Sequence, residues 1–381
     1  MAARFDCIVL GVGGFGGGAF HHLARRGANV LGIERFDVAH DRGSSHGETR
    51  VIRKAYFEHP DYVPLLHRAY DLWADLAAES GRTLFHQCGL LLAGPPQGPT
   101  IAGAKFAAEK YGLEIEDLDA ADFGERFPGL RIPEGCAAVL ETIAGYLEVE
   151  NCVRTHIESA QAAGGVLHTG ETVTGWKSDG RTVRVVTDRD AYEAASLVVT
   201  AGPWASQLLT DLGVKLEVRR KPFLWCPVAN DLYDAARPCP AWFYELPGFG
   251  EFYAIPSIDG RTIKTAEHTG GALVDDPLAV DRGLHPDDVE RLAEFLRLSA
   301  PDVDPRPVRH SICMYTNSPD GHFLVDRLPG VENVVFGAGF SGHGFKFTSV
   351  LGEALAEMAL EGRTELPVEF LSLKRFAPNA G

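Results

Sequence analysis

The amino-acid sequence predicts an α/β (α+β) fold in which two domains are interleaved along the chain. Short apolar runs typical of buried strands alternate with amphipathic helical segments in three separate stretches. Between those stretches the sequence is rich in short strand-like and aromatic segments, a pattern typical of a mainly antiparallel sheet. The chain has 381 residues, more than the roughly 250–300 that one hydrophobic core usually organises, so two domains are expected.

The first domain is expected to consist of residues 1–83, 147–213 and 323–381, and the second of residues 84–146 and 214–322. The elements expected in the first domain are strands at 5–10, 29–33, 166–168, 196–200 and 334–337, and helices ending near 26, at 60–79, at 147–163 and before Gly362. The helix at 60–79 carries its apolar residues on one face, so it is expected to pack on a sheet. In the second domain, helices are expected near 101–111 and 286–298.

Composition and charge exclude several classes of protein. The formal net charge is −16, which argues against a nucleic-acid partner and favours a soluble, cytoplasmic protein. No apolar run reaches the roughly 18–20 residues needed to span a membrane, and the N-terminus does not have the pattern of a signal peptide. The cysteines are seven, scattered and without a Cys-x-x-Cys pair, so neither a disulfide framework nor a metal site is expected.

A glycine motif follows the first strand and opens the first helix. Gly11, Gly13 and Gly16 form a G-x-G-x-x-G pattern, and Glu34 stands at the end of the next strand. In a Rossmann-like unit the glycines allow a tight turn, close approach to a pyrophosphate and close helix packing, while the acid accepts a hydrogen bond from a ribose hydroxyl. The helix N-terminus adds free N–H groups. The motif predicts a bound dinucleotide and leaves NAD and FAD both open.

Two further segments carry cations. The segment GSSHGETRVIRKAY contains His46, Arg50, Arg53 and Lys54, which share a face if it is helical and line a pocket if it is a loop. Near the C-terminus, VVFGAGFSGHGFKFTS places Lys346 at the start of the last helix, where it would pair with a carboxylate. Spacing alone leaves open a solvated basic face for the first segment and an exposed lysine for the second.

Four separated motifs resemble the monomeric sarcosine oxidase and N-methyltryptophan oxidase family. They are GSSHGETRVIRKAY, FYAIPS followed by IKTAEHT, CMYTNSPDGHF, and GAGFSGHGFKF. Their order and spacing extend the resemblance over nearly the whole chain. It implies FAD as the cofactor, attached through a thioether from Cys313. The other cofactor-binding positions that it implies, beside the glycine motif and Glu34, are Arg35, Ser44, Ser45, Gly342, Gly344 and Lys346.

The resemblance also implies roles for the polar residues. Arg50 and Lys346 would bind the substrate carboxylate, Arg53 would lie near the central flavin ring, and Lys264 would promote the reaction of reduced flavin with oxygen. The residues expected to shape the substrate cavity, some with a catalytic part, are His46, Tyr253, His268 and Tyr315.

The implied function is that of an FAD-dependent oxidase, working as a monomer, which oxidises sarcosine or another N-alkyl amino acid and reduces O2 to hydrogen peroxide. Three alternatives remain open at this point: a cyclic or glycated amino acid as substrate, a flavin dehydrogenase with another acceptor, and a flavin-binding protein without catalysis. The sequence departs from the family pattern at Glu48, Lys54 and Glu267, and Glu267 would place a charge near the cavity. The segment FLWCPVANDLYD has no clear counterpart.

Overall fold

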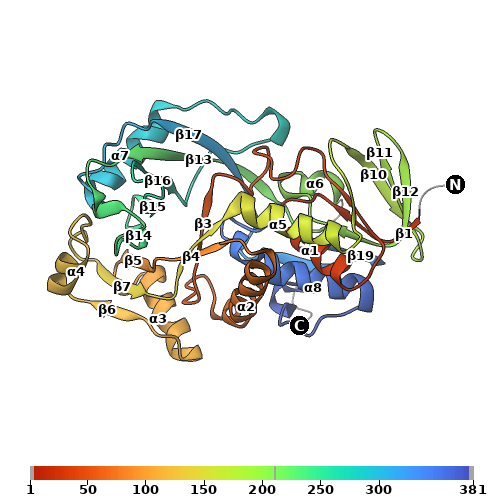
Figure 1. The fold of residues 1–381 in the computed structure, drawn as a ribbon, viewed down its shortest axis with the longest axis horizontal. Helices are drawn as coiled ribbons and strands as arrows, with labels where there is room; N and C mark the ends of the chain where they lie inside the picture. Colours follow the sequence, from red (N-terminus) through yellow and green to blue (C-terminus); the bar gives the residue numbers. More distant parts are fainter. Residues whose placement is uncertain (1–3, 210–211, 377–381) are drawn as a thin grey trace.

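The computed structural model describes residues 4–209 and 212–376. Two eight-stranded sheets form the two halves of the molecule, and a three-stranded sheet joins them (Figure 1). The mixed α/β character predicted from the sequence is confirmed. The domain boundaries stay a prediction.

The first eight-stranded sheet contains the predicted β-α-β unit. Its order is β10-β11-β12-β1-β2-β9, with β19 beside β12 and β18 beside β19. The strands are β1 (Arg4–Leu10), β2 (Val30–Ile33), β9 (Val166–His168), β10 (Val173–Ser178), β11 (Val183–Thr187), β12 (Ala191–Val199), β18 (Leu324–Leu328) and β19 (Val331–Ala338). Strands β9, β2, β1, β12 and β19 pair in parallel, so their carboxyl ends meet at one edge. This edge positions the cofactor cleft described below.

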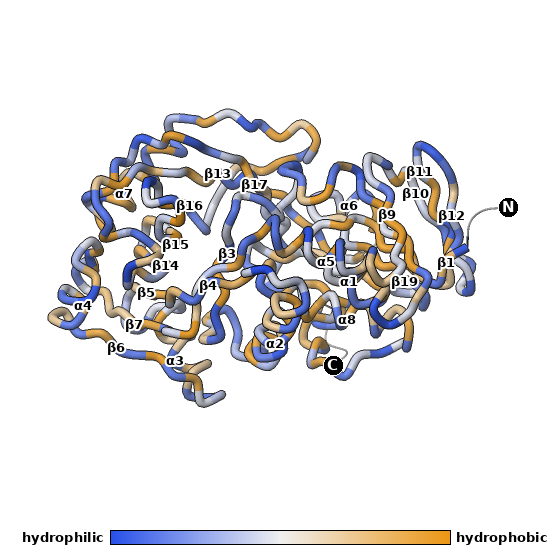
Figure 2. The backbone as a smooth tube through the Cα atoms, viewed as in Figure 1, coloured by the Kyte–Doolittle hydropathy of each residue, from blue (hydrophilic) through white to orange (hydrophobic). Residues whose placement is uncertain are grey.

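Three helices pack together against this sheet: α1 (Gly14–Arg25), α5 (Val149–Ala162) and α8 (Thr348–Glu361). Helix α1 contacts both of the others. Its crossing with α8 is so close that a Cβ at Gly18 would lie 2.1 Å from the carbonyl oxygen of Thr348. Figure 2 shows hydrophobic segments along β1 and β19, whose central residues are fully buried. Burial of these strands beneath the helices provides the core that holds the glycine motif in place.

The second eight-stranded sheet is antiparallel except where β14 pairs with β5. Its order is β17-β13-β16-β15-β14-β5-β7-β6. The strands are β5 (Leu90–Gly94), β6 (Glu116–Leu118), β7 (Ala137–Glu141), β13 (Glu217–Pro227), β14 (Ala241–Leu246), β15 (Gly250–Ile255), β16 (Thr262–Glu267) and β17 (Arg309–Asn317). The helices of this half are α3 (Pro99–Tyr111), α4 (Ala120–Arg126) and α7 (Pro286–Ser299).

The small sheet is formed by β3 (Thr49–Ile52), β8 (Gly145–Glu148) and β4 (Phe85–Gln87). The basic segment after Gly43 is therefore neither helix nor loop at its centre but a strand, which lies between the two halves in Figure 1. Helix α2 (Val63–Ser80) follows a single 3-10 turn, and a short α6 (Ala205–Leu208) completes the helices. The prediction that α2 packs on a sheet holds only for its contact with β4, because its apolar face lies mainly against α8.

Among the residues described, no helix is both long enough and apolar enough to cross a membrane.

Gly16 provides a direct test of the glycine motif. A Cβ at Gly16 would lie 1.8 Å from the carbonyl oxygen of Gly11, which is backbone and cannot rotate away. We expect Gly16→Ala to lower the free energy of unfolding by more than about 2 kcal/mol and to weaken binding of the predicted dinucleotide. The matched control is Gly124→Ala in α4, where the added Cβ meets nothing within 4 Å and stability should rise by up to about 1 kcal/mol. Thermal unfolding of both variants measures the difference. Equal stability of the two would contradict the assigned packing.

Candidate active site

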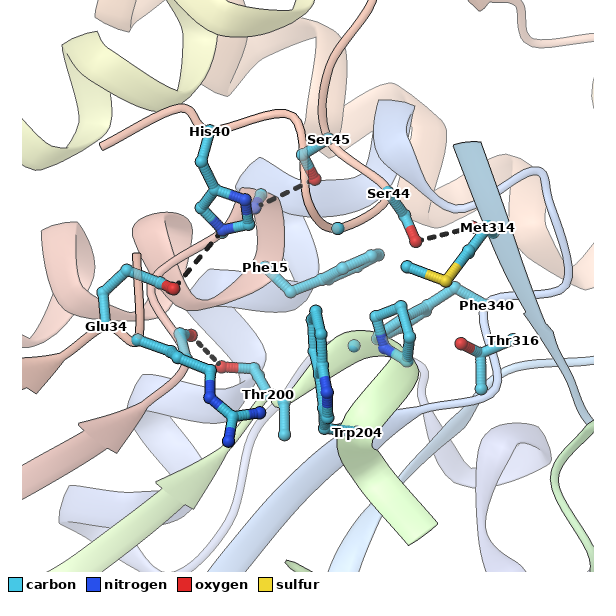
Figure 3. A pocket seen from close by; sticks show the side chains of 18 of the residues that line it. Phe15, Glu34, His40, Ser44, Ser45, Thr200, Trp204, Met314, Thr316 and Phe340 are labelled. Carbon is cyan, nitrogen blue, oxygen red and sulfur yellow. Dashed lines mark hydrogen bonds and ion pairs between the residues drawn. The ribbon is translucent and has the colours of Figure 1, made fainter. Parts of the chain in front are cut away.

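A long cleft opens at the carboxyl edge of the parallel strands. It encloses about 1310 Å³ of empty space, counting the part open to solvent. Backbone and side chains from β1, β2, β17, the segment after β12, the start of α1 and the segment before α8 line it (Figure 3). Lys346 aside, all of the predicted cofactor positions except two line this cleft. Those that line it are Gly11, Gly13, Glu34, Arg35, Ser44, Ser45, Gly342 and Gly344. The two exceptions are Gly16, which lies under the turn, and Cys313.

Glu34 is fixed in position at the end of β2. Its carboxylate accepts the N–H of Val12 at 2.9 Å and the N–H of Phe36 at 3.0 Å, and its side chain is almost fully buried. His40 Nε2 lies 3.3 Å from it (Figure 3). A carboxylate has about four lone-pair positions, so oxygen capacity remains for hydroxyl donors in the cleft. This placement suits a ribose.

Hydrogen bonds attach the serine segment to both walls of the cleft. The N–H of Gly14, in the first turn of α1, donates to Ser45 Oγ at 3.2 Å. The hydroxyl of Ser44 donates to the carbonyl of Met314 on β17 at 2.6 Å. The segment thereby bridges the nucleotide-binding turn and the second sheet, and it keeps the helix N-terminus facing the cleft.

Two buried donors in the cleft have no partner within the described residues. They are Trp204 Nε1 and Thr316 Oγ1, and both residues line the cleft (Figure 3). Buried polar groups are almost always hydrogen-bonded in folded proteins, so these two atoms indicate a ligand with acceptors at both places. Phe15 and Phe340, which also line the cleft, stack with ring centroids 3.4 Å apart and form an apolar wall.

A smaller cavity of about 570 Å³, counting the part open to solvent, adjoins this cleft. The two share Arg50, Tyr315, Gly342 and Phe345 in their linings, so a molecule in the cavity lies directly beside one in the cleft. The predicted site residues that line the cavity are Arg50, Arg53, Tyr253, His268, Tyr315 and Lys346.

Two cations in this cavity have no carboxylate partner within residues 4–209 and 212–376. Arg50 donates to the carbonyls of Thr49 at 2.9 Å and Ser44 at 3.0 Å, and Lys346 Nζ donates to the carbonyl of His343 at 2.8 Å. Burial, with the nearby charge of Arg53, lowers the pKa of Lys346 to about 7. Uncompensated buried cations are costly, and an anionic ligand would offset that cost.

The third cation, Arg53, is already paired. Its Nη2 lies 2.7 and 2.5 Å from the two carboxylate oxygens of Glu58, and its guanidinium lies 4.0 Å from the ring centroid of Phe57. Burial raises the pKa of Glu58, but the charges of Arg53, His343 and Lys346 outweigh the effect of burial and lower this pKa to about 2. Glu58 therefore stays ionised and cancels the charge of Arg53, so Arg50 and Lys346 are the cations available to a ligand.

Aromatic and imidazole side chains complete the wall. His268 lies between Phe243 and Tyr315, at ring-centroid distances of 5.6 and 5.7 Å. Burial and the charges of His343 and Lys221 lower the pKa of His268 to about 3, so the ring is neutral at pH 7. A neutral imidazole can accept a hydrogen bond at one nitrogen.

Besides Gly16, three predicted residues lie outside both linings. Lys264 Nζ is buried and donates to the carbonyls of Gly47 at 2.8 Å and Thr49 at 2.6 Å. His46 lies 5.6 Å from the ring of Phe223, and burial with the charges of Arg50 and Arg282 lowers its pKa to about 3. Cys313 is buried outside the cleft lining, with Sγ 3.5 Å from Arg50 Nη2.

Comparison with known proteins gives the family. The family described as FAD dependent oxidoreductase (DAO) matches residues 6–358. A monomeric sarcosine oxidase of Streptomyces avermitilis is 39% identical over 99% of both chains, and N-methyl-L-tryptophan oxidase of Yersinia pestis is 36% identical over 98% of this chain and 99% of its own. The chain belongs to the FAD-dependent oxidoreductase family.

Solved structures agree with this assignment. A point mutant of NikD, "an unusual amino acid oxidase essential for nikkomycin biosynthesis", is similar with a TM-score of 0.86 and 28% identity over 97% of each chain. The resemblance inferred from the four sequence motifs and the prediction of an FAD-dependent oxidoreductase are confirmed.

The cleft fits the FAD of this family. The glycines at the turn leave room for close approach of a pyrophosphate, Glu34 could accept a hydrogen bond from a ribose hydroxyl, and the two unpartnered donors, Trp204 Nε1 and Thr316 Oγ1, could bind acceptors of the cofactor. The roles given to individual residues stay predictions.

The structure also brings in residues that the sequence did not reveal. Glu58 and Phe243 line the cavity, and Phe223 lies under both Arg50 and Lys264, at 5.5 and 5.0 Å from its ring centroid. In the sequence, this ion pair was indicated only by the position of Glu58, five residues after Arg53. The charge of Glu267 does not enter the cavity lining, because Arg291 binds its carboxylate at 2.6 and 2.7 Å.

The pKa of Lys346 predicts how the FAD-loaded enzyme binds simple carboxylates. Propionate has no amine, so its affinity reports only the cations. We expect its Kd to rise as the pH increases through about 7, because Lys346 is charged below that pH and neutral above it. Titrations followed by the flavin absorbance between about pH 6 and pH 9 measure this.

Two variants separate the cations in this experiment. Lys346→Met should abolish the pH dependence, whereas Arg50→Met should retain it and raise Kd about 10- to 100-fold at every pH, as expected for a charged hydrogen bond of about 1.5–3 kcal/mol. If the pH dependence of Kd persists in Lys346→Met, a group other than Lys346 causes it.

Proposed function

We propose that this protein is an oxidase of a small amino acid with a secondary amine, such as sarcosine or another N-alkyl amino acid, which uses FAD and reduces O2 to hydrogen peroxide. The observation that carries the proposal is the pair of unpaired cations, Arg50 and Lys346, in a cavity that opens directly onto the cofactor cleft. The names of the relatives, monomeric sarcosine oxidase and N-methyl-L-tryptophan oxidase, support the substrate class.

In this proposal the two cations bind the carboxylate and thereby orient the amine end. Fixing one end of a small substrate turns an encounter into an effectively unimolecular step. Leu90, Phe243 and Tyr253 line the same cavity and supply apolar contacts for an N-alkyl group.

Other residues of the cavity contact the amine and form the cavity wall. FAD, when bound, accepts a hydride equivalent from the substrate carbon. His268 stays neutral and can accept a hydrogen bond from the amine N–H, and Arg53 with Glu58 forms a wall of fixed geometry.

Lys264 is proposed to assist the reaction with oxygen. Burial, together with the charge of Arg50, moves its pKa well below the usual value. A negative charge that develops beside it, as on reduction of O2, favours its protonated form and is stabilised by it.

We also propose that Cys313 holds the flavin covalently, that the enzyme works as a monomer and that it is cytoplasmic. The name of the first relative, monomeric sarcosine oxidase, supports the monomer. For the covalent link, the neighbours Met314, Tyr315 and Thr316 all line the cleft, so a small displacement of the strand would expose the thiol.

The substrate class is tested with purified yellow protein and a panel of secondary, cyclic and glycated amino acids. We expect bleaching of the flavin by an N-alkyl amino acid without air and stoichiometric peroxide in air. Arg50→Ala should raise KM about 10- to 100-fold for a carboxylate substrate, because a charged hydrogen bond contributes about 1.5–3 kcal/mol. Bleaching without peroxide would identify a dehydrogenase instead, and unchanged kinetics in Arg50→Ala would remove its role.

The covalent link has its own test. Acid precipitation of the wild-type protein should leave the yellow colour in the pellet, whereas Cys313→Ser should release it to the supernatant. Cys226→Ser, another buried thiol on β13, is the matched control and should behave as wild type. Release of flavin from the wild-type protein would contradict the link and leave the oxidase class intact.

A further inference from the structure

Lys221 is a buried cation to which the proposed function gives no part. It lies on β13, is 3% exposed and forms no ion pair with a carboxylate in the described ranges of the chain. Burial lowers the pKa of its ammonium to about 8. An unpaired ammonium is costly to bury, so other contacts must hold Lys221 in place.

The turn that follows His268 binds the ammonium of Lys221. Its Nζ donates to the carbonyl of Thr269 at 2.6 Å and to that of Gly270 at 3.5 Å. Backbone carbonyls satisfy N–H groups without cancelling the positive charge. Lys221 therefore fixes the residue next to His268, and below about pH 8 it keeps a positive charge there.

The same turn packs closely on the backbone of β13. Gly271 has a φ of +97°, and a Cβ there would lie 2.5 Å from the carbonyl oxygen of Arg220. The N–H of Arg220 donates to the carbonyl of Ala272 at 2.8 Å. These contacts hold the far part of the turn, whereas the hydrogen bond from Lys221 to Thr269 holds its start, directly after the imidazole.

Lys221 lies behind two wall residues of the smaller cavity, which is the substrate cavity of the proposed function. Phe223 pairs with Ala266, and Lys221 and His268 each stand two residues from this pair, so both side chains project from one face of the sheet. Nζ of Lys221 lies 5.3 Å from the ring centroid of Tyr315, and that ring lies 5.7 Å from the ring of His268. Both rings line the substrate cavity and Lys221 does not, so it acts on the cavity through them.

The charge of Lys221 also acts on the imidazole of His268. The other ionisable groups around this ring are Glu58, Glu251, Tyr253, Tyr315, His343 and Lys346. Glu58 is paired with Arg53, and burial with the charge of Glu58 raises the pKa of Glu251 to about 7. Below that pH Glu251 is mostly protonated, so neither carboxylate offsets the charges of the two lysines, which disfavour a proton on the imidazole.

We propose that Lys221 is a positioning residue for the amine end of the substrate. It fixes the turn that carries His268 and keeps the imidazole neutral, so that a ring nitrogen accepts a hydrogen bond from the amine N–H. The proposal rests on the oxidase function proposed above, in which Arg50 and Lys346 bind the carboxylate end. Lys221 thus supports the opposite end of the same molecule without contacting it.

Three substitutions separate the two parts of this role. Lys221→Met removes the donor and the charge, Lys221→Gln removes the charge but keeps an N–H donor, and Lys221→Arg keeps both. We expect Lys221→Met to raise KM for an N-alkyl amino acid about three- to tenfold, the effect of one lost hydrogen bond, and Lys221→Arg to restore most of the affinity. The Kd of propionate should remain that of the wild-type enzyme in all three variants, because propionate has no amine.

Loss of the charge has a pH signature. Without the positive charge of Lys221, the pKa of His268 rises from about 3 by about one to two units, so imidazolium forms at a higher pH. An imidazolium has no acceptor nitrogen. The ratio of KM between Lys221→Gln and wild type should therefore grow as the pH falls toward about 5, whereas the ratio for Lys221→Arg should stay constant.

A second measurement does not depend on turnover. Nuclear magnetic resonance of the FAD-loaded protein with isotope-labelled histidine reports the protonation of His268, whose signals are assigned by their loss in His268→Asn. At about pH 5 the imidazole should be neutral in wild type and Lys221→Arg, and partly protonated in Lys221→Gln and Lys221→Met. The matched control is Lys215→Met, just before β13, where the lysine side chain is 80% exposed and its loss should leave both readouts as in wild type.

The proposal would be overturned by a wild-type KM in Lys221→Met, by a loss of propionate affinity equal to that of the amine substrate, or by a neutral His268 at about pH 5 in Lys221→Gln. If Lys221→Met does not fold, the KM ratio and the resonance signals of Lys221→Gln and Lys221→Arg still decide. Failure of the oxidase function is distinguishable, because no amine would then be turned over while the protonation of His268 would still differ between the variants.

Discussion

The turn that leads into β3 is the constraint on which the rest of the site depends. Gly47 has a φ of +89°, and a Cβ there would lie 2.4 Å from the ring of Phe223, so this position requires glycine. The turn brings its carbonyls to Lys264, its N–H groups to Glu150 and the side chain of Arg50 to the point where cofactor cleft and substrate cavity meet. A shift of this one segment would move Arg50 and Lys264 together.

The site concentrates buried positive charge in a protein whose net charge is −16. Arg53 has a carboxylate partner, whereas Arg50, Lys264 and Lys346 are held by backbone carbonyls, which satisfy N–H groups without cancelling the charge. Their low solvation leaves them poised to stabilise an anion, and for both lysines it also lowers the pKa. The local field therefore selects a carboxylate or a developing negative charge, although the field of the whole protein opposes anions.

The sequence was sufficient where local geometry decides the structure. The glycine spacing, the helix after it and Glu34 predicted the nucleotide-binding turn, because each depends on residues close in the chain. It was insufficient where the partner is distant. The apolar face of α2 does not distinguish a sheet from the helix α8 on which it packs. The segment around Arg50 becomes a strand only because β8 pairs with it, and Phe223, more than 170 residues further along the chain, supplies the ring beneath Arg50 that no local pattern predicts.

The position of Lys264 follows from the same packing as that of Arg50. Both cations lie over the ring of Phe223, yet Arg50 lines the cavity beside the cofactor cleft and Lys264 does not. Burial lowers the pKa of Lys264, and the charge of Arg50 adds to this effect. An anion bound at Arg50 would offset part of that repulsion and would favour the protonated form of Lys264, so binding in the cavity and the charge of the lysine outside it would be coupled through Arg50.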